Sequence, residues 1–153
     1  MRLLSCLLLL TCATAFAAAP TVMGDWNTAD HSVVRIEPCS SAAGTPAKTV
    51  CLTIVKVPPD APRAKDGKLT DEQNPDPSLR SRPLCGLIIG NGFQQTDANH
   101  LTGGKLYDPK TGHTYSGTIA SDGDTLHLHG FIGISIFGRT ETWHRSPTIT
   151  PCT

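Results

Sequence analysis

Residues 101–129 read LTGGKLYDPKTGHTYSGTIASDGDTLHLH, and this stretch decides the fold class. Three runs in it are rich in β-branched, aromatic and other apolar residues, at 101–107, 114–120 and 125–129. They are separated by DPKTG at 108–112 and SDGD at 121–124. Both separators have turn chemistry, because proline fixes φ and glycine tolerates positive φ. Short runs joined by short turns predict antiparallel strands in a meander.

The same pattern continues on both sides of this stretch. Further β-rich runs are found at 23–28, 32–38, 50–57, 84–89 and 132–145. The run at 84–89 is followed by Gly90-Asn91-Gly92, which we expect to end it as a turn. No segment has a sustained apolar period of 3.6 residues, which argues against long helices. The sequence therefore predicts an all-β domain of about eight strands, closed as a small antiparallel barrel or folded as a sandwich.

The overall charge excludes one large class of function. Among 153 residues there are 13 Lys and Arg and 13 Asp and Glu, so the formal net charge is zero. A neutral chain lacks the basic surface that nucleic acids or anionic membranes attract, and we expect no nucleic-acid partner.

The first residues have the composition of a secretory signal peptide. Arg2 precedes an apolar run at 3–10, and residues 13–19 are rich in small side chains. We expect cleavage after Ala17, which makes 1–17 the signal and 18–153 a single exported domain, periplasmic or secreted. An uncleaved anchor and a lipoprotein signal at Cys12 are the alternatives. No later segment is apolar for long enough to span a membrane as a helix.

Cysteine usage fits an exported protein. Cys6 and Cys12 fall in the expected signal, which leaves an even number of cysteines, namely Cys39, Cys51, Cys85 and Cys152. In an oxidising compartment these are expected to form disulfides, although reduced core thiols are the alternative. Of three connectivities, Cys39–Cys51 is favoured because the two flank one turn region, with Cys85–Cys152 tying down the C-terminus. There is no close C-x-x-C pair that would indicate a metal site.

One segment interrupts the strand pattern. Residues 58–83 contain six of the twelve prolines together with many charged residues. Loops of this length are uncommon in compact domains, and they are commonly either functional or disordered. Two interpretations stay open, a solvated loop and a lid over the mouth of a barrel.

Motifs for catalysis are absent from the sequence. His127 and His129 lie two residues apart on an expected strand, but Leu126 and Leu128 should take the core face and leave the histidines in solvent. A metal ion held by this pair is the alternative. Lys110-Thr111-Gly112 has the K-T-G form that occurs in penicillin-recognising enzymes. Those enzymes also need a Ser-x-x-Lys motif, which this sequence lacks, so we expect the triplet to form a turn. We expect no cofactor and no metal.

Four motifs in order carry a family resemblance. They are Gly24-x-Trp26 followed by Val34-Arg35-Ile36-Glu37-Pro38-Cys39, then residues 74–86 (NPDPSLRSRPLCG), 103–117 and 130–145. This arrangement resembles a bacterial exported family known as domain of unknown function 2147. Leu52 departs from the family pattern, as does the length of the segment between Cys39 and Cys51. The resemblance implies a small lipocalin-like β-barrel of the calycin type and no settled activity.

The resemblance also implies how the barrel is closed. In lipocalins the Trp of a G-x-W motif covers one end, with an arginine from near the last strand across its ring. Trp26 matches that tryptophan, and either Arg139 or Arg145 could supply the guanidinium. Arg139, Glu141, Trp143 and Arg145 alternate along one expected strand and share a face, opposite Ile132, Ile134 and Ile136. We expect the first face to be a Trp-bearing closing surface; recognition of a polar or anionic group is the alternative.

The expected function is binding of a small apolar or amphipathic ligand, without catalysis. An eight-stranded barrel is wide enough for one small ligand or for its own side chains. The expected lining consists of apolar residues from several strands, namely Val34, Ile36, Ile54, Ile88, Leu126, Leu128, Phe131, Ile134 and Ile136. Two other functions are kept as hypotheses, an envelope protein that docks an unknown protein partner through residues 58–83, and a hydrolase or metal-dependent enzyme.

Overall fold

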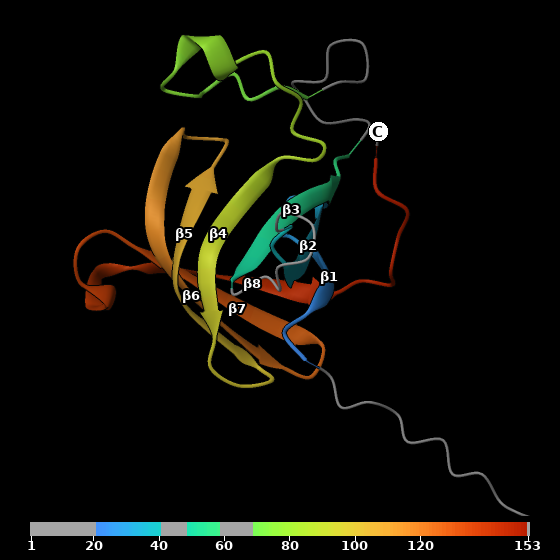
Figure 1. The fold of residues 1–153 in the computed structure, drawn as a ribbon, viewed down its shortest axis with the longest axis vertical. Coiled ribbons are helices and arrows are strands. Elements are labelled where there is room, and N and C mark those ends of the chain that lie inside the picture. Colours follow the sequence, from blue (N-terminus) through green and yellow to red (C-terminus); the bar gives the residue numbers. More distant parts are fainter. Residues whose placement is uncertain (1–20, 41–48, 59–68, 153) are drawn as a thin grey trace, which may run out of the picture.

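The computed structural model describes residues 21–40, 49–58 and 69–152. Their strands form one closed antiparallel barrel in sequence order, in which β8 pairs back onto β1 (Figure 1). The strands are β1 (Gly24–Asn27), β2 (Val33–Pro38), β3 (Val50–Lys56), β4 (Ile88–Gln95), β5 (His100–Asp108), β6 (His113–Asp122), β7 (Thr125–Phe131) and β8 (Arg139–Arg145). The barrel, not the sandwich, is the architecture of this chain. The signal-peptide prediction falls on residues outside the described ranges.

The expectation for the fourth run is wrong. β4 begins at Ile88, not Leu84, and Gly90-Asn91-Gly92 lies inside the strand and forms no turn. Gly90 is buried, and a Cβ atom there would lie 2.8 Å from the Cβ of Leu52 on β3. A glycine is needed at this position because the Leu52 side chain packs against its backbone. This requirement comes from the tertiary structure, and the local sequence does not reveal it.

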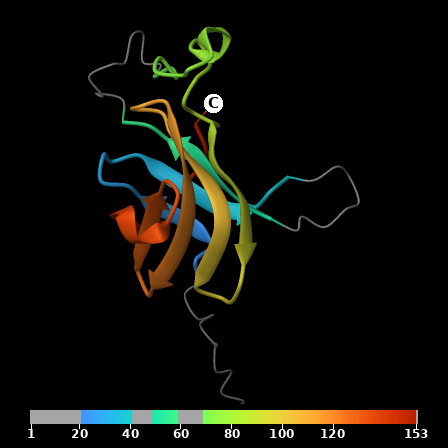
Figure 2. The same cartoon turned by 90° about the vertical axis from the view of Figure 1, so that its left-hand side faces the viewer.

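The expectation of one strand over residues 132–145 is also wrong. β8 starts at Arg139, and the 3-10 helix η2 (Ser135–Phe137) lies in the loop before it. This β7–β8 loop projects from the side of the barrel in Figure 1 and faces the viewer in Figure 2. Ile134 and Ile136 are 63% and 81% exposed and therefore do not line the barrel. A strand assignment from alternating isoleucines fails here because no neighbouring strand pairs with this segment.

The apolar core fills the end of the barrel at which β1 begins. Phe93 is fully buried and packs onto Gly104, where a Cβ atom would lie 2.3 Å from its ring. The other large, fully buried apolar side chains come from β1, β2, β3, β5, β6 and β7, namely Trp26, Ile36, Leu52, Leu101, Ile119 and Leu126. This half of the barrel is closed by its own side chains.

Trp26 and Arg145 close that end. The Arg145 guanidinium lies 3.7 Å from the centre of the Trp26 ring and donates to the carbonyl oxygen of Met23 at 2.7 Å. The Trp26 indole N–H donates to the carbonyl oxygen of Val22 at 2.9 Å. Of the two arginines considered from the sequence, Arg145 has this position, whereas Arg139 is exposed at the far end of β8.

Two disulfides join Cys39 to Cys51 and Cys85 to Cys152, the pairing favoured from the sequence. The second holds the C-terminal tail, residues 146–152, against the outside of β1, β2 and β3. Along the tail, the Ile149 amide donates to the Asp25 carboxylate at 2.9 Å, and the Cys152 amide donates to the carbonyl oxygen of Val55 at 2.8 Å. Asp25 is buried and forms an ion pair with Arg35 at 2.7 Å. That pair and a hydrogen bond from Ile149 lower the pKa of Asp25, against the effect of its burial.

Candidate functional site

A cavity of about 690 Å³ opens at the end of the barrel opposite Trp26. Its apolar wall comes from five strands, with side chains of Val34 (β2), Ile54 (β3), Ile89 (β4), Leu106 (β5) and Leu128 (β7). Inward and outward side chains alternate along each barrel strand, so one residue per strand at this level faces the cavity. The volume lies in the usual range of small-molecule sites, about 300–1,000 Å³.

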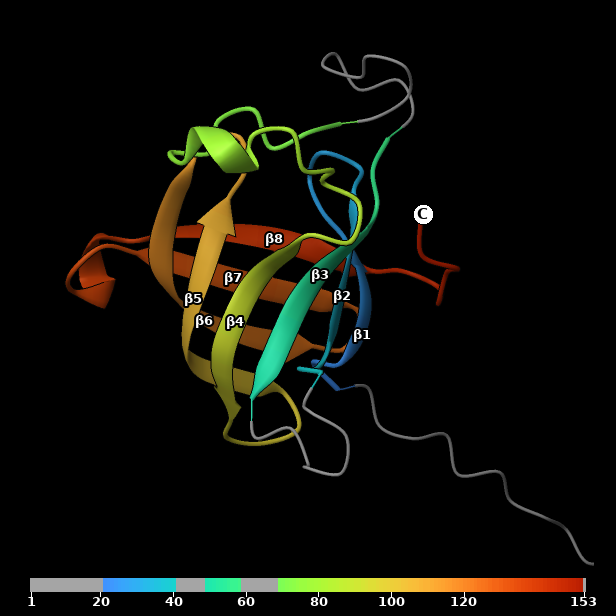
Figure 3. The same ribbon diagram turned by 45° about the horizontal axis from the view of Figure 1, so that its top comes forward.

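The chain between β3 and β4 contributes to the rim of this cavity. In Figure 3 the segment after residue 69 crosses above the mouth, and Leu69, Thr70 and Leu84 line the opening. A single bridge pairs Thr70 with Pro83 and makes the described part of this segment a closed loop. Of the described residues in the Pro-rich segment, Pro58, Leu69 and Thr70 line the cavity, as the lid interpretation expects. Residues 59–68 lie outside the described ranges.

A buried carboxylate fastens this segment to the barrel. Asp71 is fully buried and accepts hydrogen bonds from Arg82 at 2.9 Å, Asn74 at 2.7 Å and the Tyr107 hydroxyl on β5. Burial and the hydrogen bond to Asp71 raise the pKa of Tyr107, so this tyrosine stays a donor. A buried carboxylate is stable only when its lone pairs are satisfied, and here three donors satisfy them.

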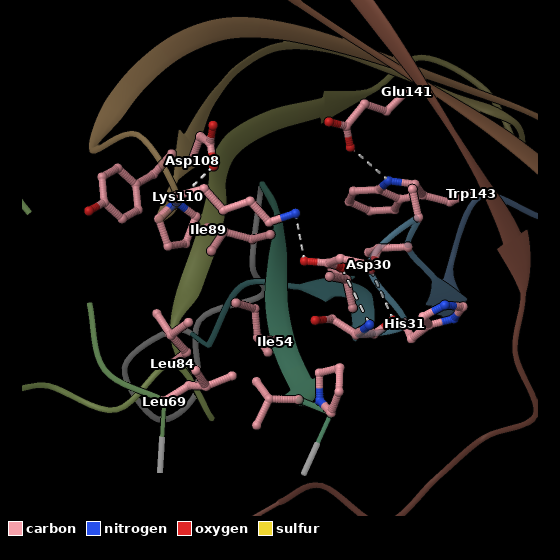
Figure 4. A pocket seen from close by; sticks show the side chains of 18 of the residues that line it. Asp30, His31, Ile54, Leu69, Leu84, Ile89, Asp108, Lys110, Glu141 and Trp143 are labelled. Atoms are coloured by element: carbon pink, nitrogen blue, oxygen red, sulfur yellow. Dashed lines mark hydrogen bonds and ion pairs between the residues drawn. The ribbon is translucent and has the colours of Figure 1, made fainter. Parts of the chain in front are cut away.

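An ion pair links two loops at the mouth. Asp30 in the β1–β2 loop and Lys110 in the β5–β6 turn approach to 2.8 Å, as Figure 4 shows. Burial opposes ionisation of Asp30, but hydrogen bonds from Lys110 and Thr28 lower its pKa to about 2. The pair therefore stabilises this arrangement fully above pH 3.8, and the contribution is lost as the pH falls from there through about 2.

Removing Lys110 is expected to raise the pKa of Asp30. In Lys110→Ala the carboxylate loses its cation, so its pKa should rise from about 2 toward the ordinary 3.8. An NMR titration of the Asp30 carboxyl carbon measures this. Lys105→Ala is the matched control, because Lys105 bonds Ser116 and should leave Asp30 unchanged. A pKa near 2 in Lys110→Ala would show that the loop-to-loop pair does not stabilise the Asp30 anion.

The cavity wall carries an acidic side chain beside a tryptophan. Glu141 and Trp143 both come from β8, and the Trp143 indole N–H donates to the Glu141 carboxylate at 3.2 Å (Figure 4). Trp143 is buried, whereas Glu141 is exposed to the hollow. A second hollow, of about 330 Å³, lies under the β7–β8 loop and shares Leu106, Leu128 and Glu141 with the main cavity. Glu141 thus lies where the two hollows meet.

The structure distributes the nine expected lining residues over several environments. Val34, Ile54 and Leu128 line the cavity, and Ile36 and Leu126 are buried in the core. Phe131 borders only the second hollow, where it stacks on His129. The remaining residues expected in the lining are solvent-exposed, namely Ile88, Ile134 and Ile136.

Ile88 is 50% exposed, so its assignment to the lining is wrong, and its neighbour Ile89 lines the cavity instead. Register shifts between β3 and β4 decide which of the two isoleucines points inward. Leu106 and Tyr107 fall within the family motif at 103–117 but were not expected in the lining, because a motif does not show which side chains face the hollow. The alternation of β8 did carry a signal for Glu141, since it shares a face with Trp143.

His127 and His129 lie on the outer face of β7. His129 contacts the Thr140 hydroxyl at 2.9 Å and the carbonyl oxygen of Ser135 at 2.8 Å, so it helps to hold η2. Within residues 21–40, 49–58 and 69–152, no group of three or more His, Cys, Asp and Glu could hold a metal ion. Lys110-Thr111-Gly112 lies in the β5–β6 turn, where Gly112 has a φ of 73°.

The chain is similar to known proteins in fold and in family. A solved protein, HP1028 of Helicobacter pylori, described as belonging to the lipocalin family, is 22% identical with a TM-score of 0.63. The match covers 82% of this chain and 83% of that one and establishes the shared fold. None of the curated proteins matches this chain. The described part contains no helix long and apolar enough to cross a membrane. Residues 24–145 match the family model described as "Uncharacterized protein conserved in bacteria (DUF2147)", and the chain belongs to this family.

Proposed function

We propose that this protein is an exported, lipocalin-like binding protein for a small apolar or amphipathic ligand, and that it is not an enzyme. The observation that carries the proposal is the cavity of about 690 Å³ with an apolar wall and a polar rim. Apolar ligands are bound by removal of their surface from water, while a few polar groups set orientation. Two disulfides support an oxidising compartment, in keeping with export.

One half of the barrel is packed and the other half is hollow, and this difference supports a binding function over a purely structural role. One half is filled by Phe93, Trp26 and their neighbours, which is sufficient to form a core. The other half is left hollow even though apolar side chains surround it, and the segment of residues 69–84 is tied down over it by Asp71. A protein that needed only a stable barrel would gain stability by packing side chains into this half as well, as it does in the other half.

A bulky side chain in the cavity is expected to weaken binding. Ile89→Trp places a larger side chain in the hollow, and we expect it to weaken binding of the neutral fluorescent probe N-phenyl-1-naphthylamine at least tenfold, measured by titration. Ile88→Trp is the matched control, because the adjacent side chain points to solvent, and its affinity should stay within about twofold of the wild type.

The unfolding midpoint of both variants shows whether the barrel is intact. Equal affinity of the two variants for the probe, or no binding by the wild-type protein, would contradict the proposed function. Native mass spectrometry of the purified protein then tests for a small molecule that is retained from the cell.

A further inference from the structure

We infer that the ligand carries a cationic group, such as an amine or a quaternary ammonium, which lies against Glu141. This inference rests on the proposed function and names the class of ligand. It differs from the alternative that the alternation of β8 had raised, recognition of a polar or anionic group. Three observations support this inference: the negative formal charge of the cavity lining, the position of Glu141 where the two hollows meet, and the contact of Glu141 with Trp143.

The charges that line the cavity sum to a negative value. Three carboxylates, Asp30, Asp108 and Glu141, are opposed by one lysine, Lys110. The other titratable lining groups are His31 and Tyr107, and the raised pKa of Tyr107 keeps it neutral. Among the described lining residues the formal charge is therefore −2 with histidine neutral. Field lines are focused in a low-dielectric hollow, so this imbalance favours cationic ligands over anionic ones.

Two of the three carboxylates have protein partners. Asp30 is paired with Lys110 at 2.8 Å. Asp108 accepts hydrogen bonds from the Lys110 amide and the Thr111 hydroxyl, both at 2.9 Å, and so serves the β5–β6 turn. Both carboxylates, Asp30 and Asp108, therefore stabilise the loops that form the rim of the cavity.

Glu141 has no such charge partner among the described residues. It receives one hydrogen bond, from the Trp143 indole at 3.2 Å, and forms no ion pair with a lysine or arginine in the described ranges. Arg139, two residues earlier on the same strand, borders only the second hollow and is exposed. A carboxylate at a partly apolar hollow with no protein cation beside it can accept a charge-assisted hydrogen bond or ion pair from a ligand cation.

The surroundings of Glu141 fit an amphipathic cation. The apolar side chains of Leu106 and Leu128 border both hollows, so the apolar body of a ligand can lie in the main cavity with its charged end at Glu141. The neighbouring Trp143 ring also lines this wall. Its indole N–H holds the Glu141 carboxylate at this wall.

The test compares three ligands that have an alkyl chain of about the same length and carry a cationic, a neutral or an anionic head group. Dodecyltrimethylammonium, dodecyl maltoside and dodecanoate displace N-phenyl-1-naphthylamine from the wild-type protein, below their micelle concentrations. We expect the cation to bind at least tenfold more tightly than dodecanoate. In Glu141→Gln this preference should fall below about threefold, while affinity for the maltoside stays within about twofold.

Glu37→Gln is the matched control, because Glu37 is exposed on β2 and its loss changes the net charge equally without entering the cavity. It should keep the full preference for the cation. Binding of the neutral probe with no charge preference, a preference for dodecanoate, or an unchanged preference in Glu141→Gln would overturn the inference and leave the proposed function intact. Failure of the neutral probe to bind would overturn the proposed function itself.

Discussion

Replacement of Cys85 and Cys152 by serine is expected to lower the free energy of unfolding by about 4 kcal/mol. This disulfide joins residues 67 apart in sequence, and a cross-link of that span removes much conformational entropy from the unfolded chain. It also holds the tail against the barrel, where the Arg35 guanidinium donates to the carbonyl oxygen of Ile149 at 2.7 Å. Because single domains are commonly stable by only about 5–15 kcal/mol, the loss is large.

Urea unfolding of the oxidised wild-type protein and of the Cys85→Ser and Cys152→Ser double variant measures this difference. The matched control replaces Cys39 and Cys51, which are 12 residues apart in sequence, and should cost about 3 kcal/mol because a shorter loop is closed. A smaller loss for the long-range disulfide than for the short one would contradict the chain-entropy account.

The second large effect is expected at the closed end of the barrel. Arg145→Leu should lower the free energy of unfolding by about 3 kcal/mol, because it removes a cation–π contact and charge-assisted hydrogen bonds. The guanidinium donates to the carbonyl oxygens of Met23 and Thr21, and so ties the residues before β1 to the end of β8. Without it, these partly buried carbonyl groups lose their donors, and the Trp26 ring loses its cover.

Arg139→Leu makes the same chemical change on the same strand and is the control. Arg139 is exposed and has no role at the closed end, so its replacement should change stability by less than about 0.5 kcal/mol. Urea unfolding monitored by the fluorescence of Trp26 and Trp143 measures both variants. Equal losses at the two positions would show that the closing role of Arg145 is not what stabilises the barrel.

Strand β4 shows most clearly which side-chain orientations the sequence alone does not predict. Ile88 and Ile89 are adjacent and chemically identical, yet one is half exposed and the other lines the cavity. Gly90 resembles a turn residue but lies inside the strand, because Leu52 on the neighbouring strand occupies the space of a side chain. The inward face of a strand depends on its register with its neighbours, and bulges between β3 and β4 shift that register.

By itself, the sequence determined the class of the fold and about how many strands it has, and it favoured the cysteine pairing that the structure shows. Those features depend on local chemistry: β-branched runs, turn residues such as those at 108–112, and the spacing of G-x-W and cysteine motifs. Only the tertiary structure decided that Arg145 covers Trp26, that the segment of residues 69–84 lies over a hollow, and that Glu141 faces into it. A cavity is a property of side chains from several strands at one level of the barrel, so it exists only once the registers of all those strands are set.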